Sequence, residues 1–403
     1  MTTGATAADI VIVGGGIYGT SLAFELGSRG YSVILLEAHE IASGASGGPG
    51  ERGVRANGRD IRELPVVSQS IERWQKFEAE IEGGVGYRRV GGLQVYDVPY
   101  GYREHEIRGR MEAQAAIQTQ LGTPTSVLTR EEVLEKEPEM TRNVIGGLYC
   151  PNDGVGDHTF ATRQFAAAAE RTGVTIRTMA RVVEIIKQGS AAKAVRLENG
   201  EVITVGSKLF LLCNAGVAKL LAPILNPHEV PHVWNLMPQM MYVTNPENRK
   251  VNHLLSHAHR RLAVKQLPDG TMMLSGGVSV THENGRVAQG SLSSTAINLT
   301  DAISTLPFLD RSEFLKVDAT RVETVALDAI PVIGQPEAAE NVYFGYAWSG
   351  HGFAISLGFT ELFADWVESG RKPSELEPFS PARFTLASTA SRSAELQAMA
   401  LSA

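Results

Sequence analysis

Two short apolar runs stand near the start of the chain, separated by a segment with helical spacing. Residues 10–13 (Ile-Val-Ile-Val) form the first run, and residues 33–36 (Val-Ile-Leu-Leu) form the second. Apolar runs of this length without alternation are typical of parallel strands that are buried on both faces. The segment between them is long enough for a crossover helix. The pattern therefore predicts a β–α–β unit.

The remaining chain divides into further helical and extended segments. Helical spacing predicts helices over residues 64–82, 102–121, 160–172 and 293–305, and a short helix capped by Thr129. Apolar or alternating runs predict strands over residues 88–96, 147–150, 174–176, 180–186, 194–197, 201–205, 208–213, 240–244, 261–264 and 272–275, with a turn at 153–157. This order predicts an α/β fold, with a mixed sheet around a substrate chamber over residues 217–321.

A glycine motif fills the turn between the first strand and the helix. Gly14, Gly16 and Gly19 follow the G-x-G-x-x-G spacing, and Glu37 ends the second strand 23 residues after Gly14. The first glycine permits a tight turn, the second lets the backbone approach a pyrophosphate, and the third lets the helix press against the strand. The helix N-terminus favours a diphosphate, and Glu37 would accept hydrogen bonds from ribose hydroxyls. The unit predicts binding of NAD or FAD rather than NADP.

Composition narrows the class of protein. A formal net charge of −7 over 403 residues gives no basic footprint for nucleic acid or an anionic membrane. No run reaches the ~18 apolar residues of a membrane span, and residues 1–8 lack the basic start of a signal peptide. Cys150 and Cys213 have neither a disulfide pattern nor metal-ligand spacing. We therefore expect a cytoplasmic protein without a metal site, a membrane span or a nucleic-acid partner.

Three later segments extend the pattern that the glycine motif begins. They are a small-residue loop at residues 42–47, a strand end at 212–216 (Leu-Cys-Asn-Ala-Gly), and a C-terminal block at 326–334 and 341–353. In this order, the four segments resemble the family of FAD-dependent oxidoreductases that includes D-amino acid oxidase, glycine oxidase and monomeric sarcosine oxidase. The resemblance runs from about Asp9 to Arg371.

The resemblance implies a Rossmann-like FAD-binding domain joined to a mixed-sheet substrate domain. We expect residues 1–50, 146–217 and 322–375 in the FAD-binding domain, and residues 51–145 and 218–321 in the substrate domain. Residues 383–403 lack a core-forming pattern and are expected to be a flexible tail.

The resemblance also implies how each segment meets the cofactor. Ser43 and Ser46 would bond the pyrophosphate or ribityl region, the backbone of Val183 would meet the adenine edge, and the 350–353 loop would meet the pyrimidine edge of the flavin. The expected cofactor-contacting residues are Gly14, Gly16, Ile17, Tyr18, Gly19, Glu37, Ala38, Ser43, Ser46, Gly47, Val183, Asn214, Ala215, Gly216, Gly350, His351, Gly352, Phe353 and Ala354.

Three positions depart from the sarcosine-oxidase pattern. Arg321 stands where those relatives carry a cysteine that bonds the flavin, so noncovalent FAD is expected. Ala354 stands where they carry a lysine that holds the substrate carboxylate, which argues against a simple N-methyl amino acid bound in that way. The strand at residues 272–274 lacks the lysine that helps oxygen react in that subfamily.

The expected reaction is oxidation of a C–N bond in an amine or amino acid, with hydride transfer to flavin N5 and formation of an imine. Oxygen or another electron acceptor would then take the electrons. Two alternatives stay open: oxidation of a C–O bond in a 2-hydroxy acid or polyol, and a role as the FAD-binding subunit of a heteromeric dehydrogenase that needs a partner subunit.

Candidate catalytic residues are fewer than the cofactor-contacting residues, because the cofactor carries out most of the chemistry. Arg52 and Arg55 follow the small-residue loop, and a guanidinium suits bidentate recognition of a carboxylate. Their alternative reading is a solvated basic loop. Arg321 would be catalytic or, if Glu323 pairs with it, structural. His351 is expected beside the flavin as a loop residue more than as a general base.

Overall fold

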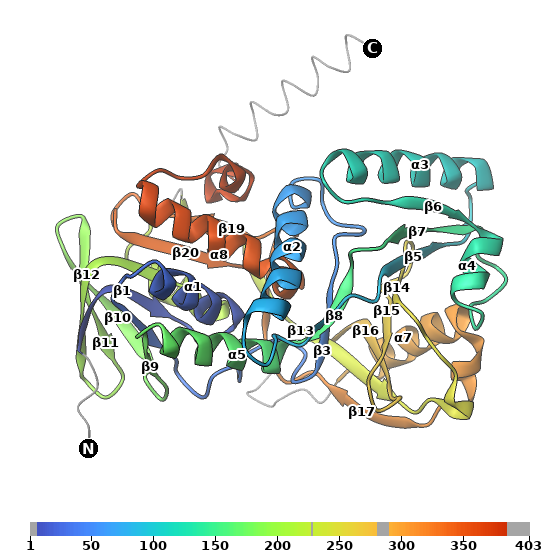
Figure 1. Ribbon diagram of the computed structural model, residues 1–403, viewed down its shortest axis with the longest axis horizontal. Coiled ribbons are helices and arrows are strands. Elements are labelled where there is room, and N and C mark those ends of the chain that lie inside the picture. The colour runs from blue at the N-terminus through green and yellow to red at the C-terminus, as the bar shows by residue number, and fades with distance from the viewer. Residues whose placement is uncertain (1–5, 227–228, 280–289, 385–403) are drawn as a thin grey trace, which may run out of the picture.

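The computed structural model describes residues 6–226, 229–279 and 290–384. Two large sheets lie side by side in these residues, with a small sheet between them, and Figure 1 shows the first large sheet on the left and the second on the right. None of the helices in this described part is long and apolar enough to cross a membrane. The predicted α/β fold is confirmed, with a Rossmann-like unit in the first sheet.

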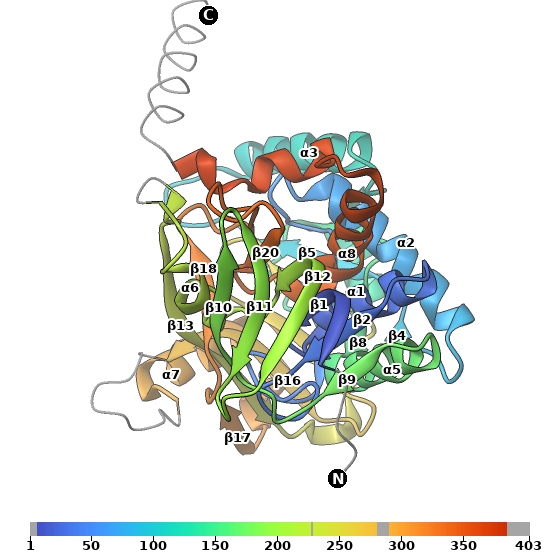
Figure 2. The ribbon, with the colours of Figure 1, turned by 90° about the vertical axis from the view of Figure 1, so that its left-hand side faces the viewer.

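The first sheet has a parallel centre and an antiparallel edge. Its parallel strands are β9 (Thr175–Arg177), β2 (Val33–Leu36), β1 (Ala7–Val13), β12 (Val202–Leu211) and β20 (Val342–Tyr346). Its antiparallel strands are β10 (Val182–Gln188), β11 (Ala191–Leu197) and β19 (Val332–Gly334). In Figure 2 the β10–β11 hairpin lies beside β12 at the front of the molecule.

Strand alternation divides the core between the two faces of this sheet. On β1, Ile10 and Ile12 belong to one buried cluster, and Val11 and Val13 belong to the other. The first face is covered by α1 (Ile17–Ser28), α2 (Leu64–Glu80), α5 (His158–Arg171) and α8 (Gly352–Ser369). Residues on the second face cluster with buried residues of the antiparallel strands β10 and β11 and of the short helix α6 (Ala215–Leu221). Both faces are therefore buried, as the two apolar runs predict.

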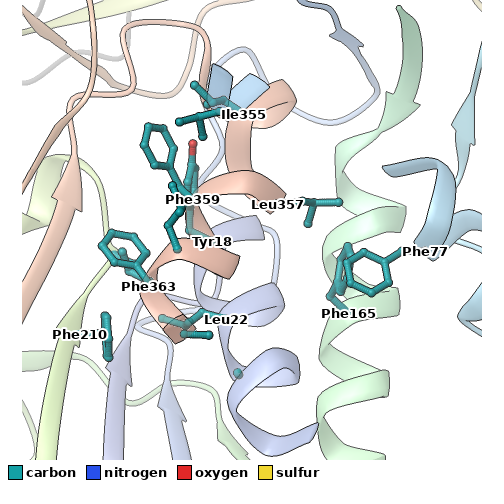
Figure 3. Close-up of a cluster of buried hydrophobic side chains, with 14 of the residues drawn as sticks. Tyr18, Leu22, Phe77, Phe165, Phe210, Ile355, Leu357, Phe359 and Phe363 are labelled. Carbon is teal, nitrogen blue, oxygen red and sulfur yellow. The ribbon is translucent and has the colours of Figure 1, made fainter. Parts of the chain in front are cut away.

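Aromatic side chains fill the space between the helices on the first face. Figure 3 shows Tyr18 and Leu22 of α1 beside Phe359 and Phe363 of α8, with Phe165 of α5 on the other side of α1. Phe165 packs edge-on against Phe77 of α2, with ring centroids 5.4 Å apart. This cluster fixes α1 and α8, whose N-termini both border the cavity described below.

The second sheet is mostly antiparallel. Its strands, in spatial order, are β17 (Phe314–Asp318), β13 (Val233–Val243), β16 (Met272–Ser279), β15 (Ala263–Gln266), β14 (Leu254–His257), β5 (Gly92–Tyr96), β7 (Gly146–Cys150) and β6 (Ser126–Thr129), and β18 (Glu323–Ala326) pairs with β13. The helices α3 (Glu104–Gln120), α4 (Arg130–Lys136) and α7 (Leu292–Thr305) pack on it. The small sheet joins β3 (Glu51–Val54), β8 (Gly154–Asp157) and β4 (Tyr87–Arg88).

The predicted helices are confirmed to within about two residues at each end, and the Thr129 side chain accepts the expected capping bond from the Glu132 N–H. Two strand predictions and one turn prediction were wrong. Residues 88–96 form two strands in different sheets, residues 153–157 contain β8 instead of a turn, and residues 201–213 contain one long strand, β12. β8 pairs with β3 and β4, and β12 pairs with β1 as well as with its neighbour β11, and local spacing carries no signal for the distant partners.

Two of the expected domain boundaries do not coincide with the sheets that the strands form. β7 and β18 belong to the second sheet, although the expected boundaries put residues 146–150 and 323–326 in the cofactor domain. Arg383, the first residue of the expected tail, is buried and donates to Asp328 over 3.0 Å. Residues 385–403 of that tail lie outside the described residues.

Alanine substitutions of two mid-helix glycines should change the free energy of unfolding in opposite directions. A Cβ on Gly109 of α3 would meet no described atom within 4 Å, whereas a Cβ on Gly358 of α8 would lie 2.5 Å from the Val66 carbonyl oxygen of α2. Gly109→Ala should raise the free energy of unfolding by about 0.5–1 kcal/mol through helix propensity. Gly358→Ala should lower it by about 1–3 kcal/mol because α2 and α8 must separate. Chemical denaturation of both variants measures this, and equal effects would contradict the close α2–α8 contact.

Candidate functional site

A cavity of about 470 Å³ lies at the carboxyl ends of β1, β2 and β12. Ligands bind at this edge in open parallel sheets, and the volume is in the range of ligand pockets. The wall consists of residues 13–18, 36–39, 42–46, 180–183, 212–214, 216, 219–220, 348, 350 and 352–353, together with Arg52, His158, Thr162, Pro238, Met240 and Glu323.

The glycine turn brings the chain very close to itself. A Cβ on Gly19 would lie 1.8 Å from the Gly14 carbonyl oxygen, and one on Gly14, whose φ is +118°, would lie 2.7 Å from the Leu212 carbonyl oxygen. A Cβ on Gly16 would meet no described atom within 4 Å, because Gly16 faces the cavity. Gly14 and Gly19 thus serve the packing of α1, and Gly16 keeps the cavity open.

The N-terminus of α1 is free to bind an anion. Gly16 is its N-cap, no side chain caps it within the described chain, and its first turn has no acidic residue. The unpaired N–H groups and the helix dipole favour a negatively charged ligand at this end. Glu37 steadies the turn, since its carboxylate accepts the N–H of Gly15 over 2.6 Å and the N–H of His39 over 2.8 Å. A carboxylate has about four acceptor sites, so it can still accept from ribose hydroxyls.

Asn214 carries an unmet hydrogen-bonding group into the cavity wall. Its φ of +44° turns the chain sharply after β12, at the start of α6. Its Oδ1 is buried and has no hydrogen-bond partner in the described part of the chain. An unpaired buried carbonyl is costly, and a ligand with a donor would satisfy it.

The opposite end of the cavity lies at the N-terminus of α8. The Gly350 N–H donates to the Glu323 carboxylate over 2.9 Å, and the Tyr18 hydroxyl donates to the Gly352 carbonyl over 2.7 Å. Tyr18 also stacks on Trp348, with ring centroids 3.6 Å apart. Burial raises the pKa of Glu323. These contacts hold residues 350–353 in place as part of the wall.

Arg52 organises the small-residue loop. Its guanidinium donates to the carbonyls of Ser46 (3.0 Å) and Glu51 (2.9 Å), to that of Gly50 (3.4 Å) and to that of Gly48. Burial lowers its pKa from the ordinary arginine value. The same loop is held by His158, whose Nε2 lies 2.7 Å from the Gly48 carbonyl oxygen. Burial, with the Arg52 charge as a smaller cause, lowers the pKa of His158 to about 4, so its imidazole is neutral at pH 7.

Arg55 and Arg59 lie behind this loop, near Asp153, and Arg59 is buried whereas Arg55 is half-buried. Arg55 donates to the Asn57 carbonyl, and Arg59 donates to the Arg55 carbonyl over 3.1 Å. The Nη1 of Arg59 is buried and has no hydrogen-bond partner among residues 6–226, 229–279 and 290–384. Burial and the neighbouring Arg55 lower the pKa of Arg59 to about 10. Burial raises the pKa of Asp153 to about 6, although it accepts the N–H groups of Ala56 and Asn57.

These residues fit a dinucleotide. The uncapped α1 N-terminus suits the diphosphate, Glu37 suits the ribose, and the orphaned Asn214 carbonyl suits a donor on the ligand. Residues 9–366 match the family described as "FAD dependent oxidoreductase". The chain belongs to this family. The ligand that the cavity takes is therefore FAD.

Individual relatives are distant in sequence. Sarcosine oxidase subunit beta of Arthrobacter sp is 23% identical over 93% of this chain and 91% of its own length. The mitochondrial dimethylglycine dehydrogenase of Mus musculus is 22% identical over 94% of this chain, which spans only 44% of that relative. The crystal structure of L-proline dehydrogenase from P. horikoshii matches with a TM-score of 0.83 and 24% identity, covering 94% of this chain and 98% of that one. At this identity the structural match shows the fold alone.

The FAD cavity includes most of the residues expected to contact the cofactor. Those on its wall are Gly14, Gly16, Ile17, Tyr18, Glu37, Ala38, Ser43, Ser46, Val183, Asn214, Gly216, Gly350, Gly352 and Phe353. Those that are not part of it are Gly19, Gly47, Ala215, His351 and Ala354. Gly47 instead lies against Met240 and Arg52, where a Cβ would be 2.8 Å from the Met240 Cγ.

Of the four expected catalytic residues, only Arg52 lies on the wall of the FAD cavity. The ring of His351 faces Glu63, with Nδ1 3.1 Å from its carboxylate. Arg321 donates to the Ser43 carbonyl over 2.6 Å and lies 4.0 Å from Asp318, so its partners are these and not Glu323. Both side chains therefore position loops of the FAD cavity.

The sequence analysis missed two buried groups. His158 stands next to the Asp157 cap of α5, and only the fold brings it to the loop at Gly48. Lys265 on β15 is directly opposite Met273 on β16, so the two side chains share one face of the sheet. Residues 272–274 match the strand that carries the oxygen-linked lysine in the sarcosine-oxidase pattern, and in this chain a lysine lies on the neighbouring strand instead.

The two roles of the glycine motif can be separated by substitution. Gly16→Ala should leave the fold and apparent Tm nearly unchanged and should reduce bound FAD, because its Cβ enters the FAD cavity. Gly19→Ala should lower stability by several kcal/mol, because its Cβ meets the Gly14 carbonyl. Visible absorbance per chain and thermal denaturation measure the two effects. Full FAD content in Gly16→Ala would show that the diphosphate lies elsewhere.

Proposed function

We propose that this protein oxidises the C–N bond of an amino acid or related amine with noncovalently bound FAD. When bound, FAD accepts the hydride that leaves the substrate carbon. In this proposal the first sheet holds FAD and the second sheet forms the substrate chamber. The diphosphate lies at the α1 N-terminus, the adenine lies near Val183, and the ring system lies between Arg52 and residues 350–353. The wall residues at these positions support the assignment.

The positions of the reactive side chains support the proposal of noncovalent attachment. Arg321 occupies the expected place of the attaching cysteine and is bonded to the Ser43 carbonyl. Cys150 is buried beside Thr125, 3.2 Å from its hydroxyl, and is absent from the wall of the FAD cavity. Cys213 lies on the wall next to Asn214, at the diphosphate end of the cavity. We therefore expect FAD to be released when the protein is denatured.

The titratable groups near the proposed position of the flavin ring system support oxidation of a C–N bond. His158 and Glu323 both line the cavity there, and both are committed to the loops around it, His158 at the Gly48 carbonyl and Glu323 at the Gly350 N–H. Every carboxylate and imidazole on the described wall has such a bond to the protein, since Glu37 and His39 are bonded as well. A neutral amine needs no base to remove a proton, because its lone pair assists departure of the hydride. This observation supports an amine substrate over a 2-hydroxy acid.

Buried positive charge supports a carboxylate on the substrate. Arg55 and Arg59 carry two positive charges, and their nearest acids are Asp153 and Glu63, of which Glu63 already contacts His351. The two acids balance the two guanidinium charges, but the buried Nη1 of Arg59 has no hydrogen-bond partner in the described chain and is left to donate. Buried cations are stabilised by anionic partners. Neither arginine is on the wall of the FAD cavity, but the charge of Arg59 acts on Tyr18, which is. This charge is proposed to attract the carboxylate of an amino acid, a role that Ala354 cannot take.

Oxygen is the proposed electron acceptor. Lys265 is buried at 4% exposure and interacts electrostatically with Arg52, which lines the FAD cavity. Lys265 is not on the wall of the FAD cavity, so its proposed effect is through space: in its charged form it would stabilise the negative charge that forms when oxygen takes an electron.

Anaerobic mixing of the purified protein with amines, amino acids and hydroxy acids tests the proposed reaction. Amino acids should bleach the visible flavin band, and hydroxy acids should leave it unchanged. Bleaching by hydroxy acids alone would overturn the C–N assignment. A chain that holds FAD but is bleached by none of them would instead favour an FAD-binding subunit that needs a partner, as the name of its sarcosine oxidase relative suggests.

Replacement of Lys265 tests the acceptor separately. Lys265→Met should leave anaerobic bleaching nearly unchanged and should slow reoxidation by oxygen at least ~10-fold, because the fixed charge is lost. Stopped-flow absorbance measures both steps. The control is Lys193→Met, on an exposed position of β11. Equal reoxidation rates in both variants would remove Lys265 from the oxygen reaction.

A further inference from the structure

A second cavity, of about 370 Å³, lies on the far side of the small sheet from the FAD cavity and shares no residue with it among those described. We name it the basic cavity. Its wall consists of Arg88, Val90, Val155, Asn248, Lys250, Val251, Asn252, His253, Leu254, Lys265, Gln266, Leu267, Pro268 and Gly270.

The described wall of the basic cavity has three cations, Arg88, Lys250 and Lys265, and no carboxylate. Lys265 is the unusual member, because it is 96% buried (4% exposed) and no described residue gives it a hydrogen bond or an ion pair. A buried ammonium without a partner is strongly unfavourable. An anion in the cavity would remove that cost.

Charges behind the wall reduce the positive charge only in part. Glu51 pairs with Arg88 over 2.5 Å and attracts Lys265, whereas Arg52 and Arg55 repel it. One Glu51 oxygen is buried without a hydrogen-bond partner in the described chain. The group formed by Arg88, Lys250, Lys265 and Glu51 therefore keeps a net positive charge, about +1 with Lys265 neutral and about +2 with Lys265 charged.

The rim of the basic cavity is held in position before any ligand binds. The Gln266 side chain accepts the Val251 N–H over 3.1 Å and donates to the Arg249 carbonyl over 3.1 Å. Buried Glu137 accepts the N–H of His253 over 2.8 Å and contacts its Nδ1 at 2.6 Å. These contacts fix the segment that carries Lys250 and His253, so a ligand would order little of the chain on binding.

We propose that the basic cavity is a binding site for a small oxyanion, a carboxylate or a phosphate-type group, held by the Lys265 ammonium with Lys250 at the rim. The site is separate from the FAD cavity and does not depend on which bond the flavin oxidises. Arg88, already paired with Glu51, adds a guanidinium to the two ammonium groups.

Binding should depend on pH in a defined direction. Burial and the charge of Arg52 lower the pKa of Lys265 to about 7. With that value, about 90% of the free protein carries the ammonium at about pH 6 and about 10% at about pH 8. If only the charged form binds, the apparent Kd should be about 10-fold weaker at the higher pH. His253 also borders the cavity, and a pH dependence caused by it would survive in the Lys265→Met variant below.

Calorimetric titration of the full-length purified protein tests the site. Sodium sulfate and sodium acetate are the probes, because their charges stay constant between about pH 6 and pH 8, and ionic strength is held constant. Saturable binding of one anion per chain, about 10-fold tighter at about pH 6, is expected. Stronger sulfate binding would identify a phosphate-type ligand, and stronger acetate binding a carboxylate. Absence of saturable binding by both anions would overturn the proposal.

Three variants assign the binding to the basic cavity. Lys265→Met should weaken binding at least ~10-fold and abolish its pH dependence, and Lys250→Ala, at an exposed position, should weaken it a few-fold and keep the pH dependence. Lys193→Met should bind like the unmodified protein. Unchanged affinity in Lys265→Met, or a pH dependence that survives in it, would overturn the proposal. Amine oxidation is not measured, so these outcomes do not depend on the proposed reaction.

Discussion

The hydrogen bonds that the Arg52 guanidinium donates are the interactions on which the rest of the site depends. The guanidinium donates to carbonyls of a loop that contains Gly47, Gly48 and Gly50, all with positive φ. Such a loop has no internal ladder to satisfy its carbonyls, and a buried carbonyl without a donor is costly. An arginine stays charged even when burial lowers its pKa, because its ordinary pKa is far above neutral.

Several other groups depend on this loop. His158 contacts the Gly48 carbonyl, and the Tyr242 hydroxyl donates to the Pro49 carbonyl over 3.2 Å. These contacts come from α5 and from β13, which belong to different layers of the fold. The loop therefore joins the two large sheets and closes one wall of the FAD cavity at the same time.

Strand β3 then separates the two cavities. Successive side chains on a strand point to opposite faces, so Arg52 reaches the FAD cavity while Glu51 pairs with Arg88 beside the basic cavity. Arg52 and Arg55, both half-buried, and the buried Lys265 put three basic groups around this strand. Repulsion within such a cluster lowers the stability of the fold, and sites that bind anionic ligands commonly tolerate this loss. The same charges account for both proposals, a carboxylate on the substrate and an oxyanion in the second cavity.

The sequence by itself determined the features that depend on neighbours in the chain. The glycine turn, Glu37, the helix caps and the family resemblance are all readable because their residues stand within about 25 positions of one another or in a fixed order. The tertiary structure alone decided what distant segments do together. In the folded chain His351 faces Glu63, Arg321 donates to the Ser43 carbonyl, and Lys265 lies buried opposite Met273. The physical reason is that burial and pairing depend on strand register between segments far apart in sequence, and no local pattern around Lys265 records which face of β15 the rest of the chain covers.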